Sequence, residues 1–157
     1  MTATIVKAAG SVTSAPTNRA VTYNGGNQNL VNAGSGTGTM YYKLNSGSWS
    51  TSIPQASTAG SYTVYYYAAE STSYNQSGTG SLTATIGQAT GSVTSAPTNR
   101  GVTYNGGNQN LVNAGSGTGT MYYRLGTSGS FSTSIPQAST AGTYTVQYYA
   151  AASTNYT

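Results

Sequence analysis

The stretch that decides the fold is Ser61-Tyr62-Thr63-Val64-Tyr65-Tyr66-Tyr67-Ala68. Every second side chain from Tyr62 to Ala68 suits a buried surface, and this period of two is that of a half-buried β-strand. The alternation recurs at 40–44 and 82–86, and no segment has the period of a helix. The side chains expected to face inward are Met40, Tyr42, Leu44, Tyr62, Val64, Tyr66, Ala68, Leu82, Ala84 and Ile86.

Four shorter strands are expected at 11–13, 21–23, 29–31 and 49–52, between turn-forming Asn-Gly and Ser-Gly pairs. About seven short strands with a turn every 8–12 residues are typical of an immunoglobulin-like β-sandwich. We therefore predict an all-β fold of this type.

The chain contains this set of strands twice. Three blocks recur unchanged: Gly10–Arg19 as Gly91–Arg100, Val21–Tyr42 as Val102–Tyr123, and Ser50–Gly60 as Ser132–Gly142. Such near-identity indicates one module copied in tandem rather than two domains with different tasks. We divide the chain into an N-terminal segment (1–9), module one (10–86), a linker (87–90) and module two (91–157).

Four motifs of the module resemble the tandem Ig-like repeats of bacterial surface proteins: Val21–Val31, Gly38–Tyr42, Ser50–Pro54 and Ala59–Val64. The resemblance covers both modules and therefore nearly the whole chain. It implies an extended stalk or fibre outside the cell and names no ligand. The chain departs from such repeats in its charge, since only 4% of its residues are charged.

The two modules differ at their ends. Module one closes with the strand Leu82–Ile86, whereas module two reaches Tyr156, the copy of Tyr74, without a counterpart of that strand. Met1–Ile5 aligns with Leu82–Ile86, and four of the five positions are identical. We expect Met1–Ile5 to be a last strand without a module before it, and module two to be a sandwich that lacks its last strand.

A sandwich without one strand exposes unpaired backbone groups and an open core. The side chains expected to fill the opening are Met1, Ala3 and Ile5. The side chains expected to line it are Val146, Tyr148 and Ala150. A complete module separates strand and opening within one chain, so we expect residues 1–6 to complete module two of a neighbouring subunit.

Such a head-to-tail contact does not close on itself and generates a filament. The arrangement resembles donor-strand complementation in assembled pili, and it implies an extracellular structural homopolymer. The alternative is a fragment of a longer Ig-like repeat stalk or adhesin, on a bacterial surface or in a phage fibre, that binds glycans through exposed tyrosines.

The composition argues against an enzyme. Glu70 is the single acidic residue, and His, Cys and Asp are absent. Metal sites need clusters of these residues, and acid–base catalysis needs two titratable groups with separated pKa values. We expect no cofactor and no metal. The net charge of +4 comes from five scattered basic residues, which neutralise too few phosphates for nucleic-acid binding.

Two kinds of surface residue are candidates for contact or modification. Five tyrosines are expected to point outward: Tyr41, Tyr65, Tyr67, Tyr122 and Tyr149. They could pair across strands, pack between subunits or stack on sugars. The pattern for N-glycosylation occurs at Asn75 and Asn155, and a sugar coat would keep a surface of low charge soluble. We expect an extracellular or cell-surface protein, or a virion fibre, without membrane insertion, because no run is long and apolar enough.

Overall fold

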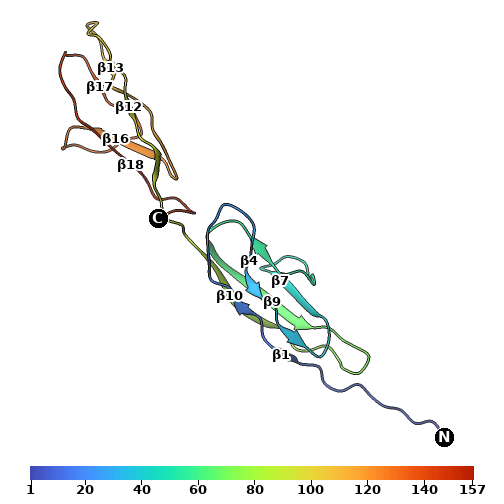
Figure 1. The fold of residues 1–157 in the computed structure, drawn as a ribbon. Coiled ribbons are helices and arrows are strands. Elements are labelled where there is room, and N and C mark those ends of the chain that lie inside the picture. The colour runs from blue at the N-terminus through green and yellow to red at the C-terminus, as the bar shows by residue number, and fades with distance from the viewer. The chain divides into compact units, whose positions relative to one another are not determined.

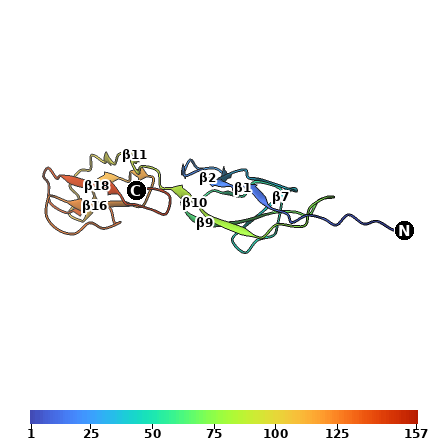
Figure 2. The same ribbon diagram turned by 90° about the horizontal axis from the view of Figure 1, so that it is seen from below.

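The computed structural model describes all 157 residues and contains strands and turns but no helix, which confirms the all-β prediction. The chain divides into two compact units, Met1–Gln88 and Ala89–Thr157. The first unit holds module one and the second holds module two. Figure 1 shows the ribbon in colours from blue at the N-terminus to red at the C-terminus, and Figure 2 gives a second view.

The strands of the first unit are β1 (Val12–Ser14), β2 (Thr17–Asn18), β3 (Val21–Thr22), β4 (Gln28–Asn29), β5 (Val31–Asn32), β6 (Ser35–Gly36), β7 (Met40–Leu44), β8 (Gln55–Ala56), β9 (Gly60–Ala68) and β10 (Gly80–Gly87). Those of the second unit are β11 (Val93–Ser95), β12 (Thr98–Asn99), β13 (Gln109–Asn110), β14 (Val112–Asn113), β15 (Ser116–Gly117), β16 (Met121–Leu125), β17 (Gln137–Ala138) and β18 (Val146–Ala150).

The main sheet of module one has the strand order β3-β10-β9-β7. The last strand, β10, lies inside this sheet and not at its edge. It pairs antiparallel with β9 over residues 80–86, and it pairs parallel with β3 at Ile86 and Gly87. Three two-stranded sheets, β1-β6, β2-β5 and β4-β8, complete the module. Two neighbouring segments of module one therefore depend on β10 for their pairing.

The core of module one consists of Leu30, Val31, Tyr42, Val64, Ala84 and Ile86. None of these side chains is more than 3% exposed, and Ala84 and Ile86 come from β10. The inward-facing alternation predicted for β7, β9 and β10 is confirmed, since its other members are buried or pack against this core. The buried Tyr42 hydroxyl accepts a hydrogen bond from the Gly34 amide at 3.0 Å, so its polar atom is satisfied.

Two of the short strands differ from their predictions. Residues 29–31 are divided between β4 and β5 at Leu30, because this residue changes partners: its amide donates to Pro54 and its carbonyl accepts from Arg19. Residues 49–52 are not a strand and make one bridge, between Ser50 and Tyr42. The chain turns there as the Ser52 amide donates to the Ser50 hydroxyl.

Module two keeps every strand pairing of module one that does not involve β10. Its pairs β11-β15, β12-β14, β13-β17 and β16-β18 correspond to β1-β6, β2-β5, β4-β8 and β7-β9. Residues 102–103, the copy of β3, form no strand, and neither do residues 142–145, the copy of the first part of β9. The two segments that β10 pairs in module one are thus irregular in module two.

Candidate functional site: an open groove in module two

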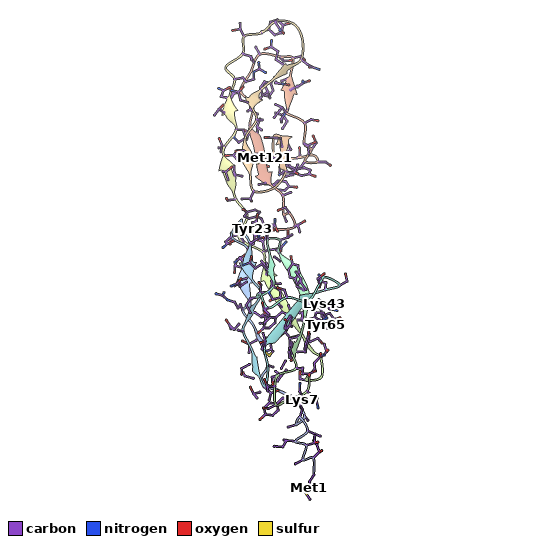
Figure 3. All side chains as sticks on the ribbon, turned by 90° about the vertical axis from the view of Figure 1, so that its right-hand side faces the viewer. Met1, Lys7, Tyr23, Lys43, Tyr65 and Met121 are labelled. Carbon is purple, nitrogen blue, oxygen red and sulfur yellow. The ribbon has the colours of Figure 1, made fainter.

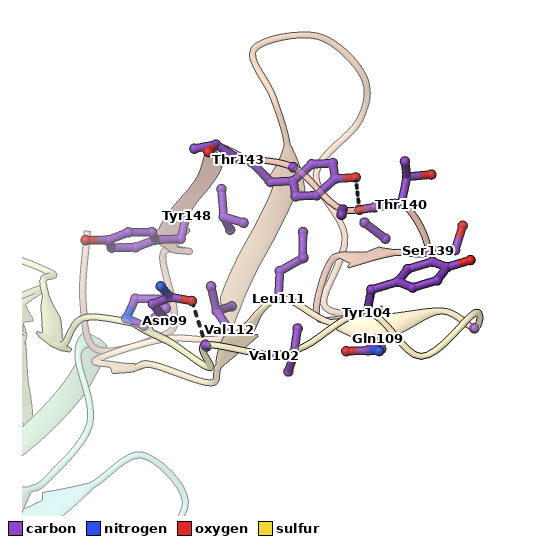
Figure 4. Close-up of a pocket in the computed structure, with 18 residues that line it drawn as sticks. Asn99, Val102, Tyr104, Gln109, Leu111, Val112, Ser139, Thr140, Thr143 and Tyr148 are labelled. Atoms are coloured by element: carbon purple, nitrogen blue, oxygen red, sulfur yellow. Dashed lines mark hydrogen bonds between the residues drawn. The ribbon is translucent and has the colours of Figure 1, made fainter.

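A groove of about 510 Å³ lies between these two irregular segments of module two (Figure 4). One wall is formed by residues 97–104 and the other by residues 138–148, with Leu111 and Val112 between them. The lining residues that matter below are Asn99, Val102, Tyr104, Thr143, Tyr144, Val146 and Tyr148. The place of β10 in the module is therefore a cavity, lined by apolar side chains together with polar side chains and backbone groups.

The apolar side chains of the groove are exposed to solvent. Val102 is 45% exposed, Tyr104 66% and Tyr148 41%, whereas their copies in module one are only half-exposed or less. Leu30 and Val31 are 0% and 2% exposed, and their copies Leu111 and Val112 are half-buried. The same residues thus form a closed core in one module and an open one in the other, because only module one supplies β10.

The N-terminal segment is the most exposed apolar part of the chain. Met1, Ile5 and Val6 are 126%, 100% and 83% exposed. Residues 1–7 belong to no strand, and Figure 3 shows Met1 at the far end of an extended segment whose base lies near Lys7. A strand-forming sequence that is fully solvated has backbone donors and acceptors free for pairing.

Ala8 ties the base of this segment to module one. The Ala8 amide donates to the Ser73 carbonyl, and the Asn75 amide donates to the Ala8 carbonyl, both at 2.9 Å. The Lys7 ammonium also forms an ion pair with the Glu70 carboxylate. The segment therefore leaves the module from a defined point.

Ala89 makes the same contacts with module two. Its amide donates to the Asn155 carbonyl and its carbonyl accepts from the Thr157 amide, again at 2.9 Å. Ile86 precedes Ala89 by three residues, as Ile5 precedes Ala8. Met1–Ile5 is thus connected to module one by the same path that connects the last strand of module one to module two.

The predicted lining of the groove is found in part. Val146 and Tyr148 line it, whereas Ala150 pairs with Met121 beyond its end. The second wall, with Val102 and Tyr104, was not expected from the sequence. A signal for it existed, because these residues repeat the alternation of Val21 and Tyr23. The parallel pairing of Val21 with the last strand, however, cannot be read from a local pattern.

The outward tyrosines form a compact cluster in each module. In module one Tyr41 stacks on Tyr67 at 5.4 Å between ring centroids, and Trp49 meets Tyr67 edge-on at 4.7 Å. The Lys43 ammonium lies 5.0 Å from the Trp49 centroid and 4.9 Å from that of Tyr65. Figure 3 shows Lys43 and Tyr65 side by side. These are cross-strand neighbours on β7 and β9.

Module two carries an altered version of the cluster. Tyr122 stacks on Tyr149 at 5.4 Å, and Phe131 meets Tyr149 edge-on. The Arg124 guanidinium lies 4.6 Å from the Phe131 centroid, and its Nε donates to Gln147 Oε1 at 2.7 Å. The pair Lys43–Tyr65 is therefore replaced by Arg124–Gln147, with a hydrogen bond in place of a cation–π contact.

The two candidate glycosylation positions lie beside the Ala8 and Ala89 contacts. Asn75 is exposed, but Ser77 of its motif is 7% exposed, and its hydroxyl accepts a hydrogen bond from the Ala68 amide at 2.8 Å. Asn155 is half-buried, and its carbonyl accepts from Ala89. In the folded protein the Asn75 motif is therefore only partly accessible.

The chain has no helix long and apolar enough to cross a membrane, and no three of its metal-ligating side chains come together. Comparison with family models, with curated proteins and with solved structures finds no match to this chain. The open groove of module two and the exposed N-terminal segment are the features of the structure that bear on function.

Proposed function

We propose that the protein is a structural subunit of an extracellular filament, built of two Ig-like sandwich modules and polymerised head-to-tail. Residues 1–6 of one subunit form the last strand of module two in the next subunit. The observation that carries this proposal is that module two has a groove where module one has β10, while the chain exposes a second copy of that strand.

The register of β10 predicts how the donated strand pairs. β10 lies antiparallel to β9, and the expected pairs are Met1 with Val146, Thr2 with Thr145, Ala3 with Tyr144, Thr4 with Thr143 and Ile5 with Gly142. Ile5 also lies beside Val102, as Ile86 lies beside Val21. Val6 takes the place of Gly87, where an added Cβ meets nothing closer than 3.8 Å.

Insertion of the donated strand covers two exposed apolar surfaces, the N-terminal segment of one subunit and the groove of the next. Large apolar side chains contribute about 1.5–3 kcal/mol each when they are fully buried, and insertion buries Met1 and Ile5 together with Val102 and Tyr148. The contact uses a different surface on each partner, so it repeats from subunit to subunit and produces an open polymer where the rotation between subunits does not close a ring.

The test compares two carboxylates placed on opposite faces of the donor. Ile5→Asp puts a charge at the position whose counterpart, Ile86, is 2% exposed, and burial of a charge without a partner is strongly unfavourable. Thr2→Asp adds the same charge at the copy of Thr83, which is exposed. Both residues are solvated in the free chain, so neither change disturbs the folding of module one.

Light scattering coupled to gel filtration and negative-stain electron microscopy measure the outcome. We expect filaments from the parent chain and from Thr2→Asp, and monomers from Ile5→Asp. A monomeric parent chain, or Ile5→Asp filaments as long and abundant as those of the parent, would overturn the proposal.

A second candidate function is glycan binding by the aromatic clusters, in a stalk or adhesin. It is favoured by the exposure of Trp49 (36%) and Tyr149 (42%) in these clusters, because aromatic rings stack on sugars. A glycan array distinguishes the two functions: saturable binding that is lost in Tyr41→Ala or Tyr65→Ala supports this candidate, and its absence excludes it.

A further inference from the structure

The strand β10 is held in module one by a side chain as well as by its neighbouring strands. Asn18 Nδ2 donates to Thr85 Oγ1 at 3.2 Å, and the Thr85 amide donates to Asn18 Oδ1 at 3.1 Å. The parallel pairing with β3 covers only Ile86 and Gly87. The carboxamide of Asn18 therefore acts as the pairing partner of Thr85, one residue before the backbone pairing begins.

Asn99 repeats this arrangement at the wall of the open groove. Asn18 Oδ1 also accepts from the Ala20 amide at 2.9 Å, and Asn99 Oδ1 accepts from the Gly101 amide at 3.0 Å. This local turn keeps the carboxamide of Asn99 at the groove (Figure 4). Its Nδ2 makes no hydrogen bond within the chain, whereas Nδ2 of Asn18 is bonded to Thr85.

We propose that Asn99 determines which strand the groove accepts, by pairing with Thr4 as Asn18 pairs with Thr85. This inference rests on the proposed function, and it names the partner as an extended segment that presents a threonine at that point. A strand shifted by one residue would place Ala3 or Ile5 opposite Asn99. The Asn99 amide would then lose the threonine hydroxyl as its partner, and the net contribution of that hydrogen bond would be missing from the shifted complex.

Asn99 by itself does not distinguish Thr4 from Thr2, because a shift by two residues again presents a threonine. The second determinant is Ala3. Its counterpart Ala84 is 0% exposed within the core, and a shift by two residues would place Met1 or Ile5 at this position. Since overpacking a close-packed core is also unfavourable, the threonine and the small residue together define a single register.

A peptide experiment tests the pairing without requiring filaments. The acceptor is the full chain carrying Ile5→Asp, which keeps its own donor out of the groove. The probes are fluorescent peptides with the sequence of residues 1–7: the parent peptide, Thr4→Val, Ala3→Val, and Thr2→Val as the matched control on the outward face. Fluorescence anisotropy measures each dissociation constant.

We expect Thr4→Val and Ala3→Val each to weaken binding about tenfold, and Thr2→Val to leave it unchanged within about twofold, because Thr2 faces solvent. With Asn99→Ala as a second change in the acceptor, the parent and Thr4→Val peptides should bind equally. This loss of discrimination is the readout that a merely structural role of Asn99 would not produce.

The two proposals fail in different ways. Peptide binding that is indifferent to Thr4→Val, or a Thr4 preference that persists in Asn99→Ala, would overturn the role of Asn99 and leave strand donation standing. The absence of binding by every peptide would overturn both.

Discussion

Modules one and two have nearly the same sequence, but only module one contains the strand β10. Val64 is 0% exposed and its copy Val146 is half-buried, while Tyr104 is 66% exposed and its copy Tyr23 is half-buried. All pairings that do not involve β10 are common to both modules. β10 therefore does more than add one set of backbone hydrogen bonds to the sheet. It gives regular pairing to the segments on either side of it, and it closes the core over Leu30 and Val31.

The sequence differences between the modules fall mainly into two places. One is the aromatic cluster, where Lys43, Trp49 and Tyr65 become Arg124, Phe131 and Gln147. The other is the site where Ala8 or Ala89 is held, where Lys7 and Glu70 become Gln88 and Ala152. The positions that form the groove and its closed counterpart are nearly unchanged, as expected if both modules are to accept the same strand.

The largest effect is expected from supplying module two with its own last strand. Appending a copy of residues 76–86 after Thr157 continues the chain as in module one and should fill the groove in cis. We expect filaments to be replaced by monomers, measured by light scattering, and the amides of residues 102–104 to become protected from hydrogen exchange.

The matched control is the same extension with aspartate at its copy of Ile86, which should leave the groove open and preserve assembly. If the apolar extension polymerises as well as the parent chain, strand exchange is not the mechanism of assembly.

A smaller difference in stability is expected when equivalent isoleucines of β10 and of the N-terminal segment are shortened to alanine. Ile86 is 2% exposed and Ile5 is 100% exposed. Ile86→Ala should lower the free energy of unfolding of module one by about 2–5 kcal/mol. Ile5→Ala should leave the unfolding of the monomer unchanged but raise the concentration needed for assembly. Chemical denaturation and sedimentation measure these two quantities, and a destabilised Ile5→Ala monomer would contradict the comparison.

A still smaller difference, in the free energy of unfolding, is expected between Val64→Ala and Val146→Ala. Both remove the same atoms, but Val64 is fully buried and Val146 lines an open groove. In an Ile5→Asp monomer we expect a loss of about 2 kcal/mol for Val64→Ala and less than about 1 kcal/mol for Val146→Ala. Equal losses in chemical denaturation would show that the groove is closed in solution.

The smallest effect is expected for Glu70→Ala, which removes the ion pair with Lys7. The two side chains are 61% and 37% exposed, and exposed pairs contribute about 0.2–1 kcal/mol. The Ala8 amide should exchange its hydrogen slightly faster at low salt and no faster at high salt. The Ala89 amide, which has no such pair nearby, is the internal control and should not change.

Much of this molecule follows from its sequence. The alternation in 40–44, 62–68 and 82–86 predicted the strands and their inward faces, because side chains on a strand alternate between two faces whatever the strand pairs with. The repeat also revealed that Met1–Ile5 is nearly identical to Leu82–Ile86 of β10.

Other features were decided only by the tertiary structure. The position of β10 between β9 and β3 depends on partners that are about 20 and 65 residues away along the chain, and a local pattern cannot choose between such partners. For the same reason the sequence indicated one wall of the groove and not the wall of Asn99, Val102 and Tyr104. The contacts of Ala8 and Ala89 are backbone hydrogen bonds, which carry no side-chain signature, so only the folded chain reveals that the two connections are alike.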